Sequence, residues 1–353
     1  MRLLTRNDQD GSMSFDHLPP PILARHDGDR LHLSGPLEEW LQVTDEGGGR
    51  LRLTAPEGGL AAALAAFEAL TAIGGESVIL LDGNGWQDLA PALQQRGIAL
   101  RHGDGLAVFP ALLWQVPDRW LVHPAPPWPE YFVRGPHGRH PLRPPKPQGL
   151  LYRRFIPWLD RWFTLRALDM KDLPLFHRWQ NDPRVAAFFE EEGSLRQHRA
   201  YLQRLLADPH ILPVIGALDG RDFAYFELYW ARENRLGAAH DCAPWDRGWH
   251  VLIGEEDIRG ADYLTAWLPS LMHYMFLAEP RCDAILGEPR ANHEQQLRNL
   301  TRSGFARLRN FDFTHKRAAL VRLERQHFFE ERLWARPSGS DGQPLRLSPS
   351  IIL

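Results

Sequence analysis

The first 110 residues contain short segments in which apolar positions recur with a fixed period. Residues 50–54 alternate between polar and apolar side chains, which is typical of a strand, whereas the Ala/Leu-rich residues 59–73 predict a helix. Residues 77–81 predict a short buried strand, 86–96 a second helix and 105–109 a third strand. The order of strand, helix, strand, helix and strand predicts an α/β layer.

The second half of the chain shows longer and more regular patterns. Its hydrophobic spacing predicts six strands, at 163–166, 212–218, 223–229, 248–254, 283–287 and 318–323, and four helices, which begin at Asp172, Ser194, Asp262 and Glu294. Asp219-Gly220, a dipeptide typical of tight hairpin turns, joins the second and third of these strands. This order of elements predicts a mixed α/β (α+β) fold.

Prolines concentrate between these two parts. The chain has 29 prolines in 353 residues, and eleven of them lie between Pro110 and Pro147. That density excludes a long helix or a central strand, because proline has no amide hydrogen to donate. Five aromatic residues in the same stretch argue against a disordered linker. We therefore predict a non-catalytic N-terminal α/β domain, an extended connector, a second domain and a C-terminal tail, at residues 1–110, 111–160, 161–336 and 337–353.

Charge and cysteine content narrow the functional classes. Lys and Arg number 41 against 44 Asp and Glu, a balance that argues against a general nucleic-acid binder. Two cysteines, Cys242 and Cys282, exclude a disulfide-rich scaffold, and with His240 and His250 they match no zinc-site spacing. There is no apolar run of the ~20 residues that a membrane span needs, and no signal-peptide core. We expect a cytoplasmic protein without metal, nucleic-acid or membrane partners.

Four motifs in the second half carry a family resemblance: HRWQNDPRV at 177–185, YFELYW at 225–230, RGWHVLIGE at 247–255 and GEPRAN at 287–292. Together they resemble the acyl-CoA-dependent GNAT acyltransferases. Within that superfamily they are similar to the siderophore-biosynthesis branch. This branch contains aerobactin-type hydroxylysine acetyltransferases, hydroxyornithine transacylases and the mycobactin lysine acyltransferase. The resemblance covers about the last half of the chain.

The resemblance implies a fold and a reaction. It implies a GNAT acyltransferase domain at 161–336 and an acyl-CoA, in the first instance acetyl-CoA, as co-substrate. The acceptor would be a small hydroxylated amino acid, N-hydroxyornithine or N-hydroxylysine, whose hydroxylamino nitrogen becomes a hydroxamate for iron acquisition. Two-domain members of the branch carry an extra N-terminal domain. From the order of strands and helices in residues 1–110, we expect this part to form a GNAT-like, degenerate half.

His250 and Glu288 are the candidate catalytic residues. His250 lies on an alternating strand beside which the resemblance places the thioester, and an imidazole with a pKa near 6.5 suits a general base at neutral pH. A histidine satisfied by hydrogen bonds within the sheet is the alternative. Glu288 follows a predicted strand, where the family has an acidic partner that orients the imidazole or holds the cationic end of the substrate. An ion pair with Arg290 is its alternative.

The loop before the long helix of the second half is the candidate coenzyme site. Helix N-termini bind anions such as a pyrophosphate, Gly260 lets the backbone approach closely, and Arg259 adds positive charge before Ala261. The loop departs from the pattern common in the family, which has two small residues in the spacing Q/R-x-x-G-x-G/A, and an ordinary turn is the alternative. The resemblance also assigns coenzyme contact to Asn292, which with Gln295 fits a helix N-cap.

Five residues are candidates for the acceptor pocket: His177, Trp179, Asn181, Glu227 and Trp230. His177 and Trp179 lie about 200° apart around a helix, so we expect one of them in the core. Glu227 is a candidate partner for a substrate ammonium, with an exposed sheet carboxylate as the alternative. For the aromatic residues the alternative is ordinary core packing.

Two other functions stay open. An N-acetyltransferase of an unhydroxylated amine, such as lysine, a polyamine or an aminoglycoside, would use the same fold. A catalytically inactive GNAT-fold binding protein would keep the fold without the chemistry. No Ser–His–Asp set or well-placed cysteine indicates an acyl-enzyme, so we expect direct transfer. The sequence does not fix the acyl chain, the acceptor, or whether the protein is a monomer or a homodimer.

Overall fold

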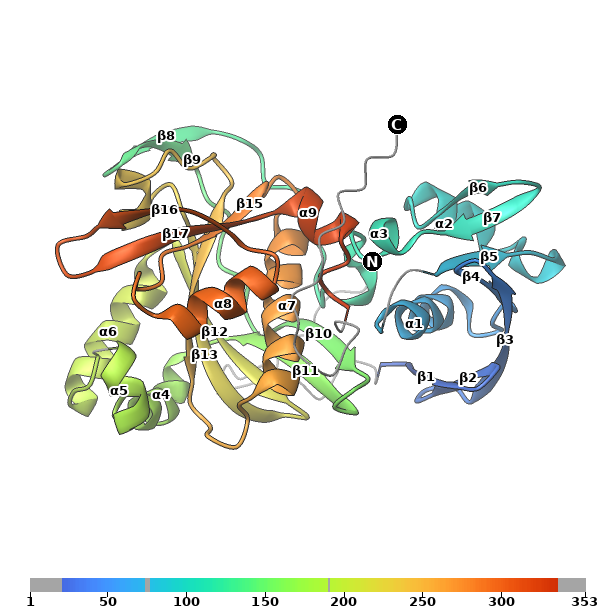
Figure 1. The fold of residues 1–353 in the computed structure, drawn as a ribbon, viewed down its shortest axis with the longest axis horizontal. Coiled ribbons are helices and arrows are strands. Elements are labelled where there is room, and N and C mark those ends of the chain that lie inside the picture. Colours follow the sequence, from blue (N-terminus) through green and yellow to red (C-terminus); the bar gives the residue numbers. More distant parts are fainter. Residues whose placement is uncertain (1–20, 74–76, 190, 336–353) are drawn as a thin grey trace, which may run out of the picture.

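The computed structural model describes residues 21–73, 77–189 and 191–335, so the predicted tail at 337–353 lies outside the described residues. Two large β-sheets dominate the fold (Figure 1). The first sheet consists of β1 (Leu23–Asp27), β2 (Arg30–Ser34), β3 (Glu39–Gly47), β4 (Arg50–Leu53), β5 (Val78–Leu81), β6 (Ala99–His102) and β7 (Gly105–Val108). Its helices are α1 (Gly59–Thr71), the short η2 (Asn84–Trp86) and α2 (Ala90–Gln95).

The predictions for this first sheet are partly confirmed. The elements expected at 50–54, 59–73, 77–81 and 105–109 are β4, α1, β5 and β7. The prediction lacks β1, β2, β3 and β6, of which β1 and β6 bury a single residue each and so show no hydrophobic period. The helix expected at 86–96 is wrong at its start. It begins only at Ala90, with a proline in its first turn, because proline lacks the amide that an earlier turn would require.

The second sheet is larger. It consists of β10 (Leu150–Ile156), β11 (Arg161–Ala167), β12 (Ile211–Leu218), β13 (Arg221–Trp230), β14 (Arg247–Ile253), β15 (Ala284–Gly287), β16 (Ala306–Asp312) and β17 (Arg317–Glu324). Its helices are α4 (Leu173–Gln180), α5 (Pro183–Phe189), α6 (Leu195–Ala207), α7 (Ala261–Ala278), α8 (Glu294–Arg302) and α9 (Arg325–Glu330). All elements predicted for the second half are present, whereas β10, β16, α5 and α9 were missing from the prediction. In the described ranges, no helix is long and apolar enough to cross a membrane.

Different helices cover the two faces of the second sheet. Leu252 on β14 belongs to a core cluster that includes residues of α4 and α6, whereas Trp249 packs in the cluster that contains α7 and α8. This confirms the predicted alternation of β14. His250 therefore lies on the face that is covered by α4 and α6.

The two sheets share one topology. In the first sheet β1 to β4 are antiparallel neighbours, β5 is parallel to β4, and β7 lies between β5 and β6. In the second sheet β11 to β14, β15, β17 and β16 have the same order and directions. Helix α1 corresponds to α7, and α2 to α8. This repetition is what a GNAT-like N-terminal half predicts. The two sheets differ in one connection: α4, α5 and α6 lie between β11 and β12, whereas only a tight turn joins the corresponding strands β1 and β2.

The proline-rich stretch contains more structure than predicted. It begins with α3 (Pro110–Leu113) and η3 (Pro117–Arg119), and a hairpin of β8 (Phe132–Gly135) and β9 (Gly138–Pro141) follows. The last residues of the predicted connector form β10, which pairs with β11 and so belongs to the second sheet. The prediction missed this strand because it extended the connector beyond the last proline of the cluster.

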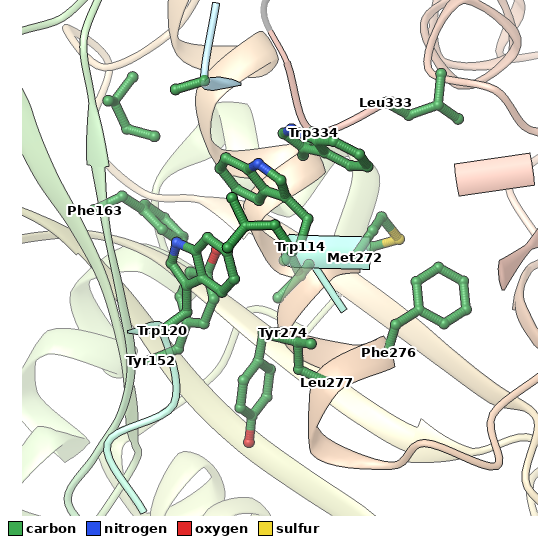
Figure 2. Close-up of a cluster of buried hydrophobic side chains, with 14 of the residues drawn as sticks. Trp114, Trp120, Tyr152, Phe163, Met272, Tyr274, Phe276, Leu277, Leu333 and Trp334 are labelled. Atoms are coloured by element: carbon green, nitrogen blue, oxygen red, sulfur yellow. The ribbon is translucent and has the colours of Figure 1, made fainter. Parts of the chain in front are cut away.

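Aromatic residues of the connector fill the junction between the sheets (Figure 2). The Trp114 ring stacks on Trp120 and Trp334 at centroid distances of 4.5 and 5.1 Å, and its Nε1 donates to Thr71 Oγ1 on α1 at 2.9 Å. Nε2 of the buried His273 on α7 donates to the Trp114 backbone oxygen at 2.6 Å. One cluster of buried apolar residues therefore continues from the first sheet into the second.

Replacement of Trp114 by alanine tests this junction. The side chain is completely buried, so Trp114→Ala is expected to lower the free energy of unfolding by about 3–5 kcal/mol in urea denaturation. Trp40→Ala is the matched control, because Trp40 lies on β3 and is 56% exposed. It is expected to cost below about 1 kcal/mol. Equal losses for the two variants would contradict the role of Trp114.

Candidate active site

The candidate site lies where two parallel strands separate. β14 and β15 pair as far as Gly248 and Leu286, and β14 then runs on to Ile253 without a further partner on that side among the described strands. His250 comes two residues after the paired part of β14, and Glu288 directly follows β15. Parallel strands open a crevice at their carboxyl ends, so the fold brings these two residues to one edge of the sheet.

The ring of His250 lies between two carboxylates. Its Nε2 is 3.0 Å from Oε1 of Glu288, and its Nδ1 is 2.9 Å from Oε2 of Glu227. Glu227 is the residue directly opposite His250 in the β13–β14 register, so its side chain lies on the same face of the sheet. The sequence predicted the proximity of His250 and Glu288 only through the family resemblance, whereas the structure brings all three residues together.

Glu288 is held by several donors. The Tyr229 hydroxyl donates to Oε2 at 2.6 Å, and Nη2 of Arg235 donates to Oε1 at 3.0 Å. Nζ of Lys316 donates to the backbone oxygen of Glu288 at 2.7 Å. A Cβ atom on Gly248 would overlap the Tyr229 ring, so this glycine makes room for the hydroxyl to reach the carboxylate. The side chain of Glu288 is 1% exposed, whereas that of Arg235 is 44% exposed and faces solvent.

These contacts change the charge of the imidazole. Burial by itself lowers the pKa of His250, but the charge of Glu288 and the hydrogen bonds with Glu227 and Glu288 outweigh it and raise the pKa to about 9. Burial raises the pKa of Glu288, yet the neighbouring imidazolium holds it well below its ordinary value. The expected pKa near 6.5 is therefore wrong for this environment, because the sequence did not reveal the second carboxylate. At neutral pH the ring carries a positive charge.

The candidate coenzyme loop ends in an exposed helix N-terminus. Helix α7 starts at Ala261, and its N-cap Gly260 has a φ of 106°, which side-chain-bearing residues rarely adopt. A Cβ on Gly260 would meet no atom of the described residues within 4 Å, so the backbone faces open space. Arg259 is exposed beside it. These features fit a group that binds an anion.

The structure corrects one detail of the next helix. Asn292 was expected to cap α8 with Gln295, but α8 begins one residue later than that pattern requires. Its N-cap is His293, whose Nδ1 accepts from the Gln296 amide at 3.2 Å. Asn292 is exposed in the preceding turn. In the described part of the chain, no group of three or more His, Cys, Asp or Glu side chains is arranged to hold a metal ion.

Comparison with known proteins identifies the family of the chain. The model of the acetyltransferase (GNAT) domain matches residues 169–313. Acyltransferase ato1 of Omphalotus olearius is 36% identical over 271 residues, which are 69% of this chain and 69% of that protein. The chain belongs to the GNAT acetyltransferase family.

Two further relatives each match about half of this GNAT protein. The N(6)-hydroxylysine O-acetyltransferase of Escherichia coli is 44% identical over 192 residues, 54% of this chain and 61% of that protein. The hydroxyornithine transacylase SID3 of Ajellomyces capsulatus is 45% identical over 199 residues, 55% of this chain and 45% of that protein. This chain thus spans about half to three fifths of the length of these two relatives.

Three acceptor candidates of the GNAT domain lie on or just after α4. Nδ1 of His177 is 2.8 Å from Nδ1 of His198 and 3.0 Å from Nδ2 of Asn181. Asn181 also exchanges two hydrogen bonds with the backbone of Gly193, so the cluster ties α4 to the segment before α6. Trp179 is the core member that we expected, since its buried ring packs on the backbone beside β14.

The other two acceptor candidates are buried and already paired. The Glu227 carboxylate is 4% exposed and bonds to protein groups through both oxygens. The guanidinium groups of Arg143 and Arg247 lie 4.2 and 4.7 Å from the centroid of the Trp230 ring. Contact of these two side chains with the acceptor stays a prediction. The alternating pattern of β13 identified a common face but not what covers it.

Sequence reasoning missed five polar residues of the GNAT site: Tyr201, Tyr225, Tyr229, Arg235 and Lys316. Tyr225 and Tyr229 alternate with Glu227 along β13, so their common face was visible in the sequence. Tyr201 lies on α6, Arg235 in the loop between β13 and β14, and Lys316 in the turn between β16 and β17. No motif indicated that these three reach the same edge of the sheet.

The charge of Glu288 is expected to maintain the high pKa of His250. Replacement by the uncharged Glu288→Gln should lower that pKa by about 1–3, because an opposite charge in contact is lost. The measurement is a titration of the His250 ring by ¹⁵N NMR, with the signal assigned from a His250→Ala spectrum. Glu294→Gln, at an exposed position of α8, is the control and should leave the pKa unchanged. An unaltered pKa in Glu288→Gln would refute this role of Glu288.

Proposed function

We propose that this protein transfers an acyl group, in the first instance acetyl, from acyl-CoA to the hydroxylamino nitrogen of N-hydroxyornithine or N-hydroxylysine. The product would be a hydroxamate for siderophore biosynthesis. The observation that carries the proposal is the contact between His250 and Glu288 at the point where β14 and β15 separate. The relatives named for hydroxylysine and hydroxyornithine support the choice of acceptor.

In the proposed reaction the acceptor nitrogen attacks the thioester carbonyl directly. A C–N bond forms, the C–S bond breaks, and coenzyme A leaves as the thiolate, which becomes the free thiol when the His250 imidazolium returns the proton taken from the acceptor nitrogen. Nε2 of His250, in its neutral form, takes the proton that the nitrogen loses, and the Glu288 carboxylate stabilises the imidazolium. Backbone amides of β14 beyond Gly248 are available to polarise the carbonyl, since that edge has no partner among the described strands.

The coenzyme is proposed to bind along the same opening. The exposed N-terminus of α7 with Gly260 and Ala261 would receive the pyrophosphate, and Arg259 would add charge. Asn292 precedes α8 at the other side of the opening and is retained as a coenzyme contact. Each of these residues is exposed in the structure, as a ligand contact requires.

We propose that the first sheet does not bind coenzyme. Helix α1 is the counterpart of α7, but the Glu39 carboxylate accepts hydrogen bonds from the amides of Glu57 and Gly58 directly before the helix, at 2.7 and 3.4 Å. A carboxylate already neutralises the positive end of this helix and would repel a phosphate. This supports a single active site in each chain.

The charges around Glu288 favour an amino-acid acceptor over a polycation. Arg235 and Lys316 flank the carboxylate, and Arg235 is its solvent-facing contact. A polyamine or an aminoglycoside brings several positive charges, which these two side chains would repel. Two alternative functions are tested by the following measurement: acylation of an unhydroxylated amine, and ligand binding without catalysis.

An acceptor panel tests the proposed function. Release of free thiol from acetyl-CoA is followed with ornithine, lysine, their N-hydroxy forms and spermidine, and an N-hydroxy amino acid is expected to be the preferred acceptor. His250→Ala should lower turnover by about 10²–10⁴-fold. His32→Ala, in the first sheet, should not change it. Faster turnover of an unhydroxylated amine would show that the proposed acceptor is wrong. Absence of turnover with every acceptor would favour a catalytically inactive GNAT-fold binding protein.

The pKa of about 9 for His250 predicts the pH dependence. A general base must be neutral, so kcat/KM is expected to rise with pH, at most tenfold per pH unit, and to level off near pH 9. The measurement is kcat/KM with the preferred acceptor across this range. A rate that falls towards pH 9 would instead identify the imidazolium as the active form and would overturn the general-base role.

A further inference from the structure

Glu227 lies on the opposite side of the His250 ring from Glu288 and has no role in the reaction proposed above. We propose that Glu227 is a positioning residue that keeps the proton on Nδ1 of His250 and thereby makes Nε2, beside Glu288, the nitrogen that exchanges protons. The inference deepens the proposed function and rests on it for the meaning of that exchange. The hydrogen bonds of Glu227 and its position opposite His250 support this role.

The neighbours of the His250 ring determine which of its nitrogens carries a hydrogen. An ionised carboxylate only accepts hydrogen bonds, so the 2.9 Å contact between Oε2 of Glu227 and Nδ1 of His250 requires a hydrogen on Nδ1. In a neutral imidazole only one nitrogen is protonated. Glu288 makes the same demand on Nε2, 3.0 Å away, but the positive charges of Arg235 and Lys316 offset the charge of that carboxylate. Nη2 of Arg235, itself a donor, also lies 3.4 Å from Nε2, so the lone pair of the neutral ring is assigned to Nε2. That is also the side on which the site meets solvent, because Arg235 is half-exposed.

Two tyrosine hydroxyls and the His250 ring hold Glu227 in its ionised form. The hydroxyls of Tyr201 and Tyr225 both donate to its Oε1, at 2.6 and 2.9 Å. Burial raises the pKa of each tyrosine and the nearby Glu227 charge raises it further, so both remain donors across the working pH range. Burial also raises the pKa of Glu227, but the hydrogen bond and charge of His250 outweigh it and the carboxyl stays ionised.

The two tyrosines also fix the orientation of the Glu227 carboxylate. Tyr201 comes from α6 and Tyr225 from β13, and the ring of Phe176 on α4 packs against both, at centroid distances of 5.8 and 5.0 Å. Glu227 is thus fixed by two different elements. With Oε1 occupied by two hydroxyls, Oε2 is the oxygen that faces His250. The carboxylate therefore has one orientation relative to the ring.

Other charged groups also face this set and enter any pH profile. Glu288, Tyr229, Arg235 and Lys316 act on His250 from the side of Nε2. Glu191, before α6, lies within electrostatic reach of Glu227, and burial together with the Glu227 charge raises its pKa. The proposal therefore needs a readout of the ring itself and not only of the rate.

Glu227→Gln provides that readout. If the two tyrosines keep the amide oxygen on their side, the NH₂ group faces Nδ1 and donates to it. The neutral ring then carries its proton on Nε2 and has no lone pair towards the substrate. ¹⁵N shifts of the ring above its pKa distinguish the two tautomers. We expect the Nδ1–H form in the native protein and the Nε2–H form in Glu227→Gln.

The tautomer change predicts a specific loss of activity. Turnover of Glu227→Gln should fall by about 10²–10⁴-fold, as expected when a catalytic histidine is held in the wrong tautomer. The loss should persist at high pH, since deprotonation leaves the proton on Nε2. Asp222→Asn is the matched control, because Asp222 lies on the same strand but pairs with Arg166. It should alter neither the ring signals nor the pH profile.

A second variant covers the case in which Glu227→Gln does not fold. Tyr201→Phe removes one anchor and keeps the carboxylate, so the ring should remain in the Nδ1–H form while turnover falls by about 2- to 10-fold. Retention of the Nδ1–H form in folded Glu227→Gln, or an Nε2–H ring in the native protein, would overturn the proposal. So would native-like turnover of Glu227→Gln.

The two proposals fail independently. The tautomer is measured without any substrate, so a protein that acylates none of the acceptors can still show the predicted change of the ring. That result would remove the proposed function and leave the positioning role. Conversely, active Glu227→Gln with an unchanged tautomer would remove only the role of Glu227.

Discussion

The buried charge around His250 is the constraint on which the rest of the site depends. Two carboxylates and one imidazolium leave a net negative charge beneath the surface of the sheet, and such charge is costly unless every oxygen finds a donor. The three tyrosine hydroxyls and Arg235 donate to the carboxylates, and Lys316 adds a positive charge 3.9 Å from Oε1 of Glu288. The polar face of β13 is therefore as necessary to the site as His250 itself.

The register of the sheet makes this arrangement possible. Glu227 meets His250 because the β13–β14 register sets them directly opposite, and a slip by one residue would turn Glu227 to the other face of the sheet. The turn between β12 and β13, in which Asp219 and Gly220 have φ values of 47° and 78°, sets the register of those two strands.

The sequence predicted elements and single residues better than contacts between them. Periodicity located the main strands and helices of the second half, and the family resemblance named His250 and Glu288 as candidates, which the structure brings into contact. The contact of Glu227 with His250 was not predicted, because alternation along one strand identifies a face but not the residue opposite. The surroundings of Trp230 were not predicted either, since the arginines beside it come from β14 and from the proline-rich stretch. Asn292 shows that one residue of error in a helix start transfers the N-cap to a neighbour.

The two sheets have the same strand order but differ in the side chains and helices around it. Both place a helix after the fourth strand of an antiparallel series and begin the next strand parallel to it. In the first sheet, however, Glu39 occupies the amides before α1, and no described helix follows β1 as α4 to α6 follow β11. The corresponding helix starts therefore differ, since the one at Gly260 is exposed and the one before α1 is closed by a carboxylate. The shared fold alone does not establish the function of the second half, and the proposed function rests on individual side chains.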